Sequence, residues 1–143
     1  RRRPEEGSAM KPAVGVDIVG IGRIEAVLAR WGDRFRKRVF TEGEIRYCEG
    51  KRFPAGHYAA RFAAKEAFFK STGNILRRGW NYRDIEVVRS EGGRPSIRVL
   101  GRVAEALGRE RDLSWDVSLT HERRYAAAVV VLYSRPSTEE DHA

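Results

Sequence analysis

An alanine-rich segment without glycine or proline, Arg61 to Lys70, constrains the fold of this chain more than any other stretch. Its composition favours a helix, and Glu66 and Lys70 stand four positions apart, on one helical face. A carboxylate beside an ammonium group can hold a divalent cation and a phosphate oxygen together. The same spacing is common in exposed ion pairs, which contribute only about 0.3–0.5 kcal/mol. The pair alone leaves a binding site and a solvated helix face both open.

The elements on either side of this segment predict an antiparallel α+β domain. In the first half, periodicity and a capping box indicate a strand and three helices, at residues 14–19, 21–31, from 41 onward and about 55–71. In the second half, short strands and one short helix are expected at 85–88, 97–100, 103–107, 116–120 and 126–132, with a hairpin turn at 91–95. We expect the antiparallel sheet to pack against the long central helix and the shorter N-terminal helices.

The length and composition are those of one globular domain, since 143 residues with 41% hydrophobic and 34% charged side chains can bury a single core. We expect this domain at residues 13–133, between a flexible basic arm (1–12) and a flexible tail (134–143). The longest apolar run, Tyr125 to Tyr133, is too short to span a bilayer, and the charged N-terminal residues lack a secretory signal. The single cysteine, Cys48, excludes an internal disulfide and is expected to be half-buried on a helix. These features predict a cytoplasmic protein.

The net charge of +8 belongs to the expected domain. Residues 1–11 hold four basic and two acidic side chains, and residues 134–143 hold one basic and three acidic, so +2 and −2 cancel outside it. A basic surface attracts polyanions: nucleic acid, a phosphorylated cofactor or an acidic protein. One reading is therefore a non-enzymatic module that binds RNA or DNA through Lys, Arg and exposed aromatic residues such as Trp80 and Tyr82. The other is an enzyme acting on a phosphorylated substrate.

Asp17 interrupts the first apolar strand, where an unpaired buried carboxylate would destabilise the fold. It must lie near the strand end, pair with a base or bind a cation. Two carboxylates from separate elements, such as Asp17 and Glu66, suit magnesium, which prefers hard oxygens and leaves its other positions to water and substrate phosphates. A structural salt bridge and a magnesium site both remain open for Asp17.

His121 follows a short predicted strand that also carries Ser118 and Thr120. A single histidine is often structural, so its position alone assigns no role. A nucleophilic Ser118–His121 pair is not indicated, because the chain has neither a G-x-S-x-G elbow nor a convincing third member.

Three segments together resemble the holo-acyl-carrier-protein synthase family, the small phosphopantetheinyl transferases. They are a G-x-D-I strand at Gly15–Ile18, an R-F-A-x-K-E-A-x-x-K helix at Arg61–Lys70 and an S-x-T-H sequence at Ser118–His121, in the family's order. The resemblance runs from about Val14 to Tyr133. It implies a magnesium-dependent enzyme that transfers the 4′-phosphopantetheine group of coenzyme A to a serine of apo-acyl carrier protein and releases 3′,5′-ADP.

The resemblance also implies catalytic roles. Asp17 and Glu66 match the aspartate and glutamate that coordinate magnesium on the pyrophosphate of coenzyme A. Glu66, directly or through a metal-bound water, is the candidate general base for the carrier serine. Lys70 would offset negative charge on the departing 3′,5′-ADP or assist proton transfer.

Substrate contacts are carried over in the same way. The positions implied to contact coenzyme A are Arg61, Phe62, Gly93, Arg94, Pro95 and His121. His121 would approach the phosphates, and the hairpin would pack near the adenine, although Gly92 stands where the family often has a polar residue. Lys51 and Arg52 lie near the family's basic residues for the 3′-phosphate. Phe62 also has the spacing of a core residue.

Arg23, Arg30 and Arg34 form the remaining basic cluster. They could be a solvated helix face, but the resemblance implies that the first helix docks the acidic helix of acyl carrier protein. It further implies a homotrimer with sites between subunits, so that Asp17, Glu66 and His121 could come from different chains. No nucleic-acid or membrane partner is expected on this reading.

Overall fold

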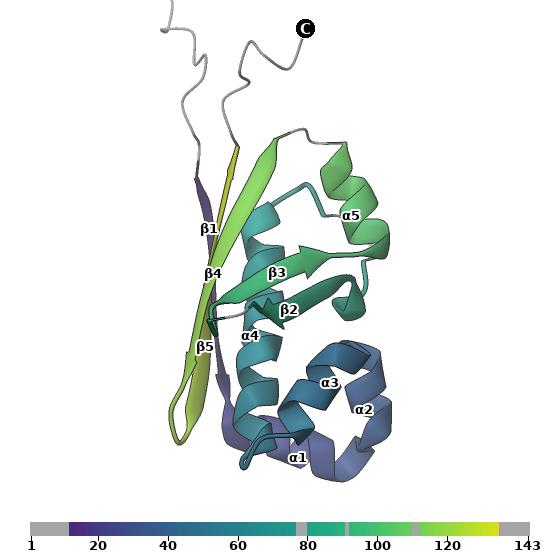
Figure 1. The fold of residues 1–143 in the computed structure, drawn as a ribbon, viewed down its shortest axis with the longest axis vertical. Helices are drawn as coiled ribbons and strands as arrows, with labels where there is room; N and C mark the ends of the chain where they lie inside the picture. Colours follow the sequence, from purple (N-terminus) through teal and green to yellow (C-terminus); the bar gives the residue numbers. More distant parts are fainter. Residues whose placement is uncertain (1–11, 77–79, 91, 110–111, 135–143) are drawn as a thin grey trace, which may run out of the picture.

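The computed structural model describes residues 12–76, 80–90, 92–109 and 112–134 (Figure 1). The predicted arm lies outside these residues except for Pro12, and so does the predicted tail except for Ser134, the last residue of the final strand. The elements in chain order are β1 (Ala13–Gly20), α1 (Ile21–Trp31), α2 (Asp33–Val39), α3 (Glu42–Glu49), α4 (Pro54–Thr72), η1 (Tyr82–Asp84), β2 (Ile85–Arg89), β3 (Pro95–Val99), α5 (Gly101–Gly108), β4 (Leu113–His121) and β5 (Tyr125–Ser134).

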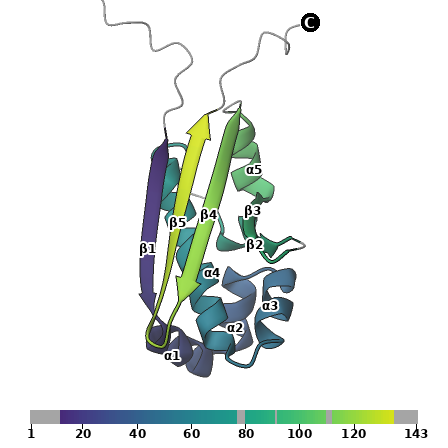
Figure 2. The same ribbon diagram turned by 60° about the vertical axis from the view of Figure 1, so that its left-hand side comes forward.

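A three-stranded antiparallel sheet with the order β1-β5-β4 forms one side of the molecule. Helix α4 runs along one face of this sheet, and the separate β2–β3 hairpin and α5 lie on the other side of α4 (Figures 1 and 2). Helices α1 to α3 gather at one end of α4 (Figure 1). The predicted α+β class, with its sheet against a long central helix, is confirmed, but the strands form two sheets rather than one.

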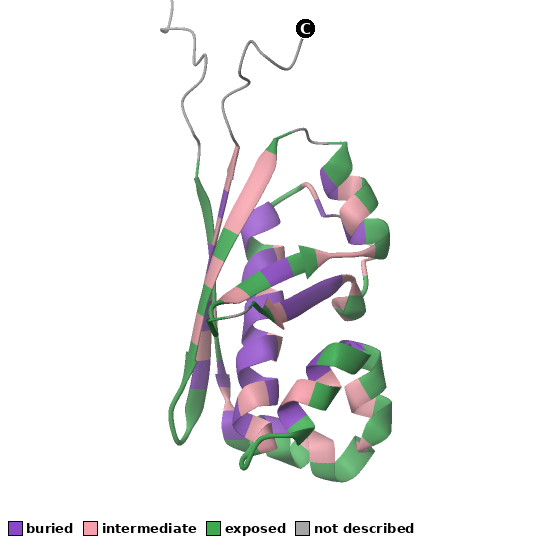
Figure 3. Cartoon of the chain, viewed as in Figure 1, coloured by how far each residue is buried: buried purple, intermediate pink, exposed green. Residues whose placement is uncertain are grey.

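Helix α4 is buried along most of its length because elements cover it from both sides (Figure 3). Five of its buried residues are alanines, whose small side chains let the sheet approach closely. The closest approach is at Gly15 on β1, where an added Cβ would stand 1.8 Å from the carbonyl oxygen of Ala67. Since side chains alternate along a strand, Asp17 faces α4 on the same side as Gly15. The glycine therefore sets how near Asp17 comes to the helix.

A buried ion pair joins α3 to α4. The ammonium of Lys65 lies 2.7 Å from a carboxylate oxygen of Glu44, and both side chains are fully buried. Lys65 also donates to the backbone oxygens of Tyr82, at 2.9 Å, and Ile85. Burial lowers the pKa of Lys65, while the Glu44 charge opposes this shift. Because a lone buried charge is strongly unfavourable, each partner depends on the other.

Three features differ from the sequence-based expectations. Helix α2 was not predicted, and it begins after Gly32, which adopts a positive φ of 52°. Trp80 and Tyr82 are half-buried against the core rather than exposed, which removes the aromatic support for a nucleic-acid module. Cys48 is fully buried, and burial raises the pKa of its thiol to about 12. Among the described helices, none combines the length and the apolar character needed to cross a bilayer.

Candidate active site

The predicted residues Asp17 and Lys70 meet across β1 and α4. The Lys70 ammonium lies 3.0 Å from Asp17 Oδ1 and also donates to the Val16 carbonyl oxygen at 3.1 Å. Only 16% of the Asp17 side chain is exposed, against 51% of that of Lys70. The ion pair found for Lys70 among the described residues thus runs to Asp17, not along the helix to Glu66 as its spacing suggested. This geometry supports a basic partner for Asp17 and brings both groups to one place.

Glu66 lies on the same helix, one turn before Lys70, and is half-buried. Its Oε1 accepts a hydrogen bond from the Tyr82 hydroxyl. Burial raises the pKa of Tyr82, and the hydrogen bond to Glu66 and the charges of Glu66 and Asp17 act in the same direction. The Tyr82 hydroxyl therefore binds Glu66 directly, within a single chain.

The chemistry of these two carboxylates fits a magnesium ion. Among the described residues, no group of three or more His, Cys, Asp or Glu side chains could hold a metal. Two carboxylates suffice for magnesium, because it usually keeps several waters and takes further oxygens from substrate phosphates. Asp17 and Glu66 would be its protein ligands, and the exposed Lys70 beside them could contact the same phosphates.

Arg61 lies one turn and a half earlier on α4, in a second cluster. Only 1% of Arg61 is exposed, and its buried Nε has no hydrogen-bond partner. Its guanidinium carbon lies 4.0 Å from the centre of the Tyr47 ring, and Lys51 and Arg89 lie over the same ring at 4.6 and 5.5 Å. A cavity of about 300 Å³ opens beside Tyr47, Arg61 and Arg89. The cluster concentrates positive charge beside this cavity, which Glu86 and Arg98 also line.

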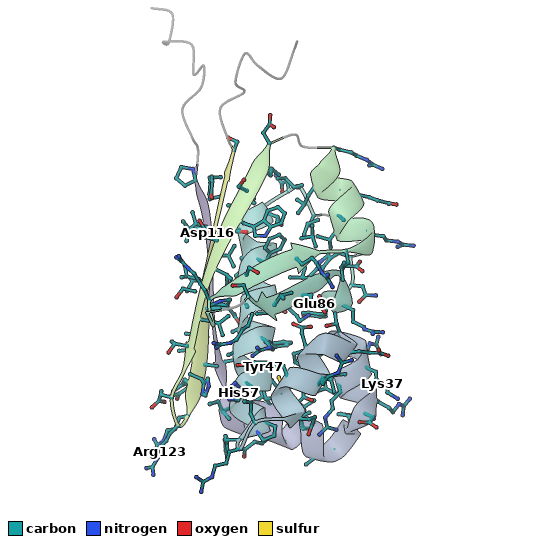
Figure 4. All side chains as sticks on the ribbon, viewed as in Figure 1. Lys37, Tyr47, His57, Glu86, Asp116 and Arg123 are labelled. Carbon is teal, nitrogen blue, oxygen red and sulfur yellow. The ribbon has the colours of Figure 1, made fainter. Side chains whose placement is uncertain are left out.

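His121 ends β4 against the first turn of α4. Gly56 permits this packing, since an added Cβ there would lie 3.0 Å from His121 Nδ1. The centre of the His121 ring lies 4.8 Å from that of His57. The His57 ring in turn lies 5.7 Å from that of Tyr47, and both of these residues are labelled in Figure 4. Burial lowers the pKa of His57 to about 4, and the nearby charges of His121 and Arg61 act in the same direction. His57 is therefore neutral near pH 7.

The predicted hairpin residues join this second cluster through Arg89. Gly93 adopts a φ of 80°, and its carbonyl oxygen accepts a hydrogen bond from the Arg89 guanidinium at 2.8 Å. Arg94 is exposed, and Pro95 begins β3 opposite Arg89. The hairpin tip and Arg61 are thus linked by one arginine over the Tyr47 ring.

Phe62 follows Arg61 in the sequence but does not join the cluster around Arg61 and Tyr47. Its ring stacks on Tyr82 at 5.6 Å, so it belongs with the Glu66 cluster and not with Arg61.

The three predicted docking arginines are all exposed, but they lie on two helices. Arg23 and Arg30 are on α1, whereas Arg34 is on α2. Arg30 and Arg34 lie over the exposed Trp31 ring at 5.1 and 5.9 Å. A groove of about 500 Å³ between the two helices is lined by Val27, Trp31, Arg34, Phe35 and Arg38. It combines apolar and basic side chains.

The chain matches the model of the 4′-phosphopantetheinyl transferase superfamily over residues 13–130. The chain belongs to this family. Among curated relatives, the holo-[acyl-carrier-protein] synthase of Syntrophus aciditrophicus is 45% identical over 86% of this chain and 96% of its own length. That of Gloeobacter violaceus is 46% identical over 87% of this chain and 94% of its own.

Solved structures of other transferases share the fold. The Chronobacterium ammoniagenes ACPS–CoA complex has a TM-score of 0.77 and 31% identity, covering 90% of this chain and 99% of the other. The Bacillus anthracis holo-(acyl-carrier-protein) synthase in complex with CoA (3′,5′-ADP) has a TM-score of 0.71 and 31% identity, covering 88% and 99%.

Several residues that complete the clusters of this phosphopantetheinyl transferase were not predicted to belong to them, and Tyr82 was considered only as an exposed aromatic residue of a nucleic-acid module. Tyr82 contacts Glu66, Tyr47 and Arg89 surround Arg61, and His57 lies against His121. The run Trp80-Asn81-Tyr82 after the central helix was a visible aromatic signal for the first cluster. The second cluster had no local signal, because its members come from α3, α4, β2 and β4.

Proposed function

We propose that this protein transfers the 4′-phosphopantetheine group of coenzyme A to a serine of apo-acyl carrier protein and releases 3′,5′-ADP. The observation that carries the proposal is the Lys70–Asp17 ion pair across the β1–α4 contact, with Glu66 one turn before Lys70 on the same helix, at residues whose pattern resembles the family motif. Their charges are those needed to bind a metal-bound pyrophosphate.

Each side chain has a task in this proposal. Asp17 and Glu66 would hold a magnesium ion, whose chemistry there would be to orient the pyrophosphate and to neutralise its charge during transfer. Lys70 offsets negative charge on the leaving 3′,5′-ADP. Glu66, directly or through a water molecule, would take the proton from the carrier serine as the serine oxygen attacks phosphorus. Positioning and charge stabilisation supply most of the rate, as in phosphoryl transfers generally.

The second cluster is proposed to bind the nucleotide part of coenzyme A. The unpaired Nε of the buried Arg61 supports this role, because a buried donor without an acceptor is unfavourable until a ligand supplies one. His121 would contact a phosphate, with Lys51 and Arg89 adding positive charge. The turn at Gly93, Arg94 and Pro95 would lie near the adenine.

The groove between α1 and α2 is proposed to dock the acidic carrier protein. Arg23, Arg30 and Arg34 would steer the carrier by charge, which makes the association rate salt-dependent. The exposed Trp31 would bury apolar surface within the groove.

A homotrimer is also proposed, with the number of subunits taken from the family resemblance. An exposed apolar row on β1 supports self-association: Val14, Val16 and Ile18 are 61%, 62% and 66% exposed. They pair in register with Val131, Val129 and Ala127 of β5, so the row extends across the outer sheet face. Light scattering should give a mass of three chains, and Val16→Glu should dissociate them.

The proposed location is the cytoplasm. The single described cysteine is buried and needs no oxidising compartment.

The test is to incubate the protein with apo-carrier, coenzyme A and magnesium and to weigh the carrier by mass spectrometry. We expect the carrier to gain one phosphopantetheine, to stop gaining it when the metal is chelated, and to gain it at least tenfold more slowly with folded Lys70→Ala. A carrier whose mass never changes contradicts the proposal. Stabilisation by a generic oligonucleotide, insensitive to magnesium, would instead favour a nucleic-acid module.

A further inference from the structure

Tyr82 is bound by consecutive residues of α4 on two sides. Its backbone oxygen accepts a hydrogen bond from the buried Lys65 ammonium at 2.9 Å, and its hydroxyl donates to Glu66 Oε1. Neighbouring residues of a helix point about 100° apart, so the segment holding Tyr82 is anchored on one face of α4 while its side chain reaches another. Lys65 is itself fixed by Glu44.

Aromatic contacts fix the Tyr82 ring as well. The ring stacks on Phe62 at 5.6 Å with an interplanar angle of 23°, and Trp80 lies 4.9 Å away at 59°. Trp80 in turn stacks on Phe69 at 4.8 Å. Contacts of this kind restrict the ring to one orientation, so the hydroxyl is aimed at Glu66 before any substrate binds.

We propose that Tyr82 is a positioning residue for Glu66: its hydroxyl occupies Oε1, so that Oε2 is left, in a fixed orientation, for the metal and the reaction. This inference rests on the proposed function, in which Glu66 is a metal ligand. Partners that orient a metal-binding carboxylate in this way affect metal affinity or activity on the order of tenfold or more when removed. Tyr82 itself touches neither metal nor substrate in this account.

The decisive variant is Tyr82→Phe, which keeps the stacked ring and removes only the hydroxyl. Tyr58→Phe is a matched control, because it also removes a tyrosine hydroxyl that donates to a glutamate, in this case Glu49 at 2.7 Å. Tyr58 lies on α4 and is buried, in a position remote from the proposed metal ligands. Binding of Mn²⁺ in the presence of coenzyme A, followed by electron paramagnetic resonance, reads metal affinity without turnover. Circular dichroism and thermal melting check the fold of each variant.

We expect Tyr82→Phe to weaken Mn²⁺ binding on the order of tenfold and to lower kcat with little change in the KM for the carrier, while Tyr58→Phe binds Mn²⁺ as the wild type does. In a Glu66→Ala background, Tyr82→Phe should have no further effect on Mn²⁺ affinity, because its target is gone. Equal Mn²⁺ affinity in wild type and Tyr82→Phe would overturn the positioning role alone. A wild type that binds no Mn²⁺ with coenzyme A would overturn the metal site and this inference together.

Discussion

Replacing Gly15 with alanine should disturb both the fold and the site. The new Cβ would stand 1.8 Å from the Ala67 carbonyl oxygen and 2.7 Å from the Ser71 amide nitrogen, which are backbone atoms of α4. Ordinary contact requires β1 to move away by about 1.5 Å. Overpacking of this kind typically destabilises by about 3 kcal/mol, and for a chain of this size that lowers Tm by about 10 °C.

The same displacement moves Asp17, two residues along, away from Lys70 and Glu66. A misplacement of about 1 Å at a catalytic group can lower the rate about 100-fold, so carrier modification should fall more than the loss of folded protein explains. Chemical denaturation measures the stability, and Gly22→Ala is the control because nothing lies within 4 Å of its added Cβ. In that exposed helical position alanine should stabilise by about 0.5–1 kcal/mol. A Gly15→Ala protein within 1 kcal/mol of the wild type, with full activity, would show that β1 accepts a Cβ at this position without moving away from α4.

Three further predictions concern other parts of the molecule. Lys65→Met should lower the free energy of unfolding by about 3–5 kcal/mol in denaturant titrations, because it leaves the Glu44 charge buried alone, and a loss below 1 kcal/mol would count against that pair. Since the pKa of His57 is lowered to about 4, unfolding lets this group bind a proton, so its contribution to stability is lost as pH falls from about 6.5 to about 4. Between pH 7 and pH 4, the free energy of unfolding of the wild type should therefore fall relative to that of His57→Gln, whose side chain does not titrate. A difference between the two proteins that stays the same over this range would contradict the lowered pKa of His57. Reversing Arg30 and Arg34 to Glu should raise the KM for the carrier at least tenfold and leave the KM for coenzyme A nearly unchanged, whereas equal effects on both would argue against the docking groove.

Local chemistry explains which elements could be predicted. The helix at Ile21–Trp31 and the capping box at Thr41 were predictable because their signals lie within about three helical turns and one helical turn, respectively. Helix α2 has only two apolar residues that mark its buried face, Phe35 and Val39, and this is too few to show a period. Its formation depends on packing beside α1, which no local pattern reports.

The candidate site was predictable only in part, for a similar reason. The family motif predicted that Asp17, Glu66 and Lys70 belong to one site. The spacing along α4 suggested an ion pair between Lys70 and Glu66, whereas the ion pair in the structure joins Lys70 to Asp17. The structure pairs it with Asp17 because Gly15 lets β1 lie directly on the helix. The contact of Tyr82 with Glu66 could not be predicted, because the position of Tyr82 depends on a hydrogen bond from the buried Lys65. These two residues are 17 positions apart in the sequence.

We propose that Asp17 and Glu66, from two separate elements, share one divalent cation at the pyrophosphate of coenzyme A. Crystals grown with coenzyme A and Mn²⁺, measured at the manganese absorption edge, would locate that ion directly. We predict one anomalous peak between the two carboxylates and beside the pyrophosphate, absent in crystals of Asp17→Asn. A manganese ion held by other residues, or carboxylates that turn away from one another around the bound substrate, would contradict the account.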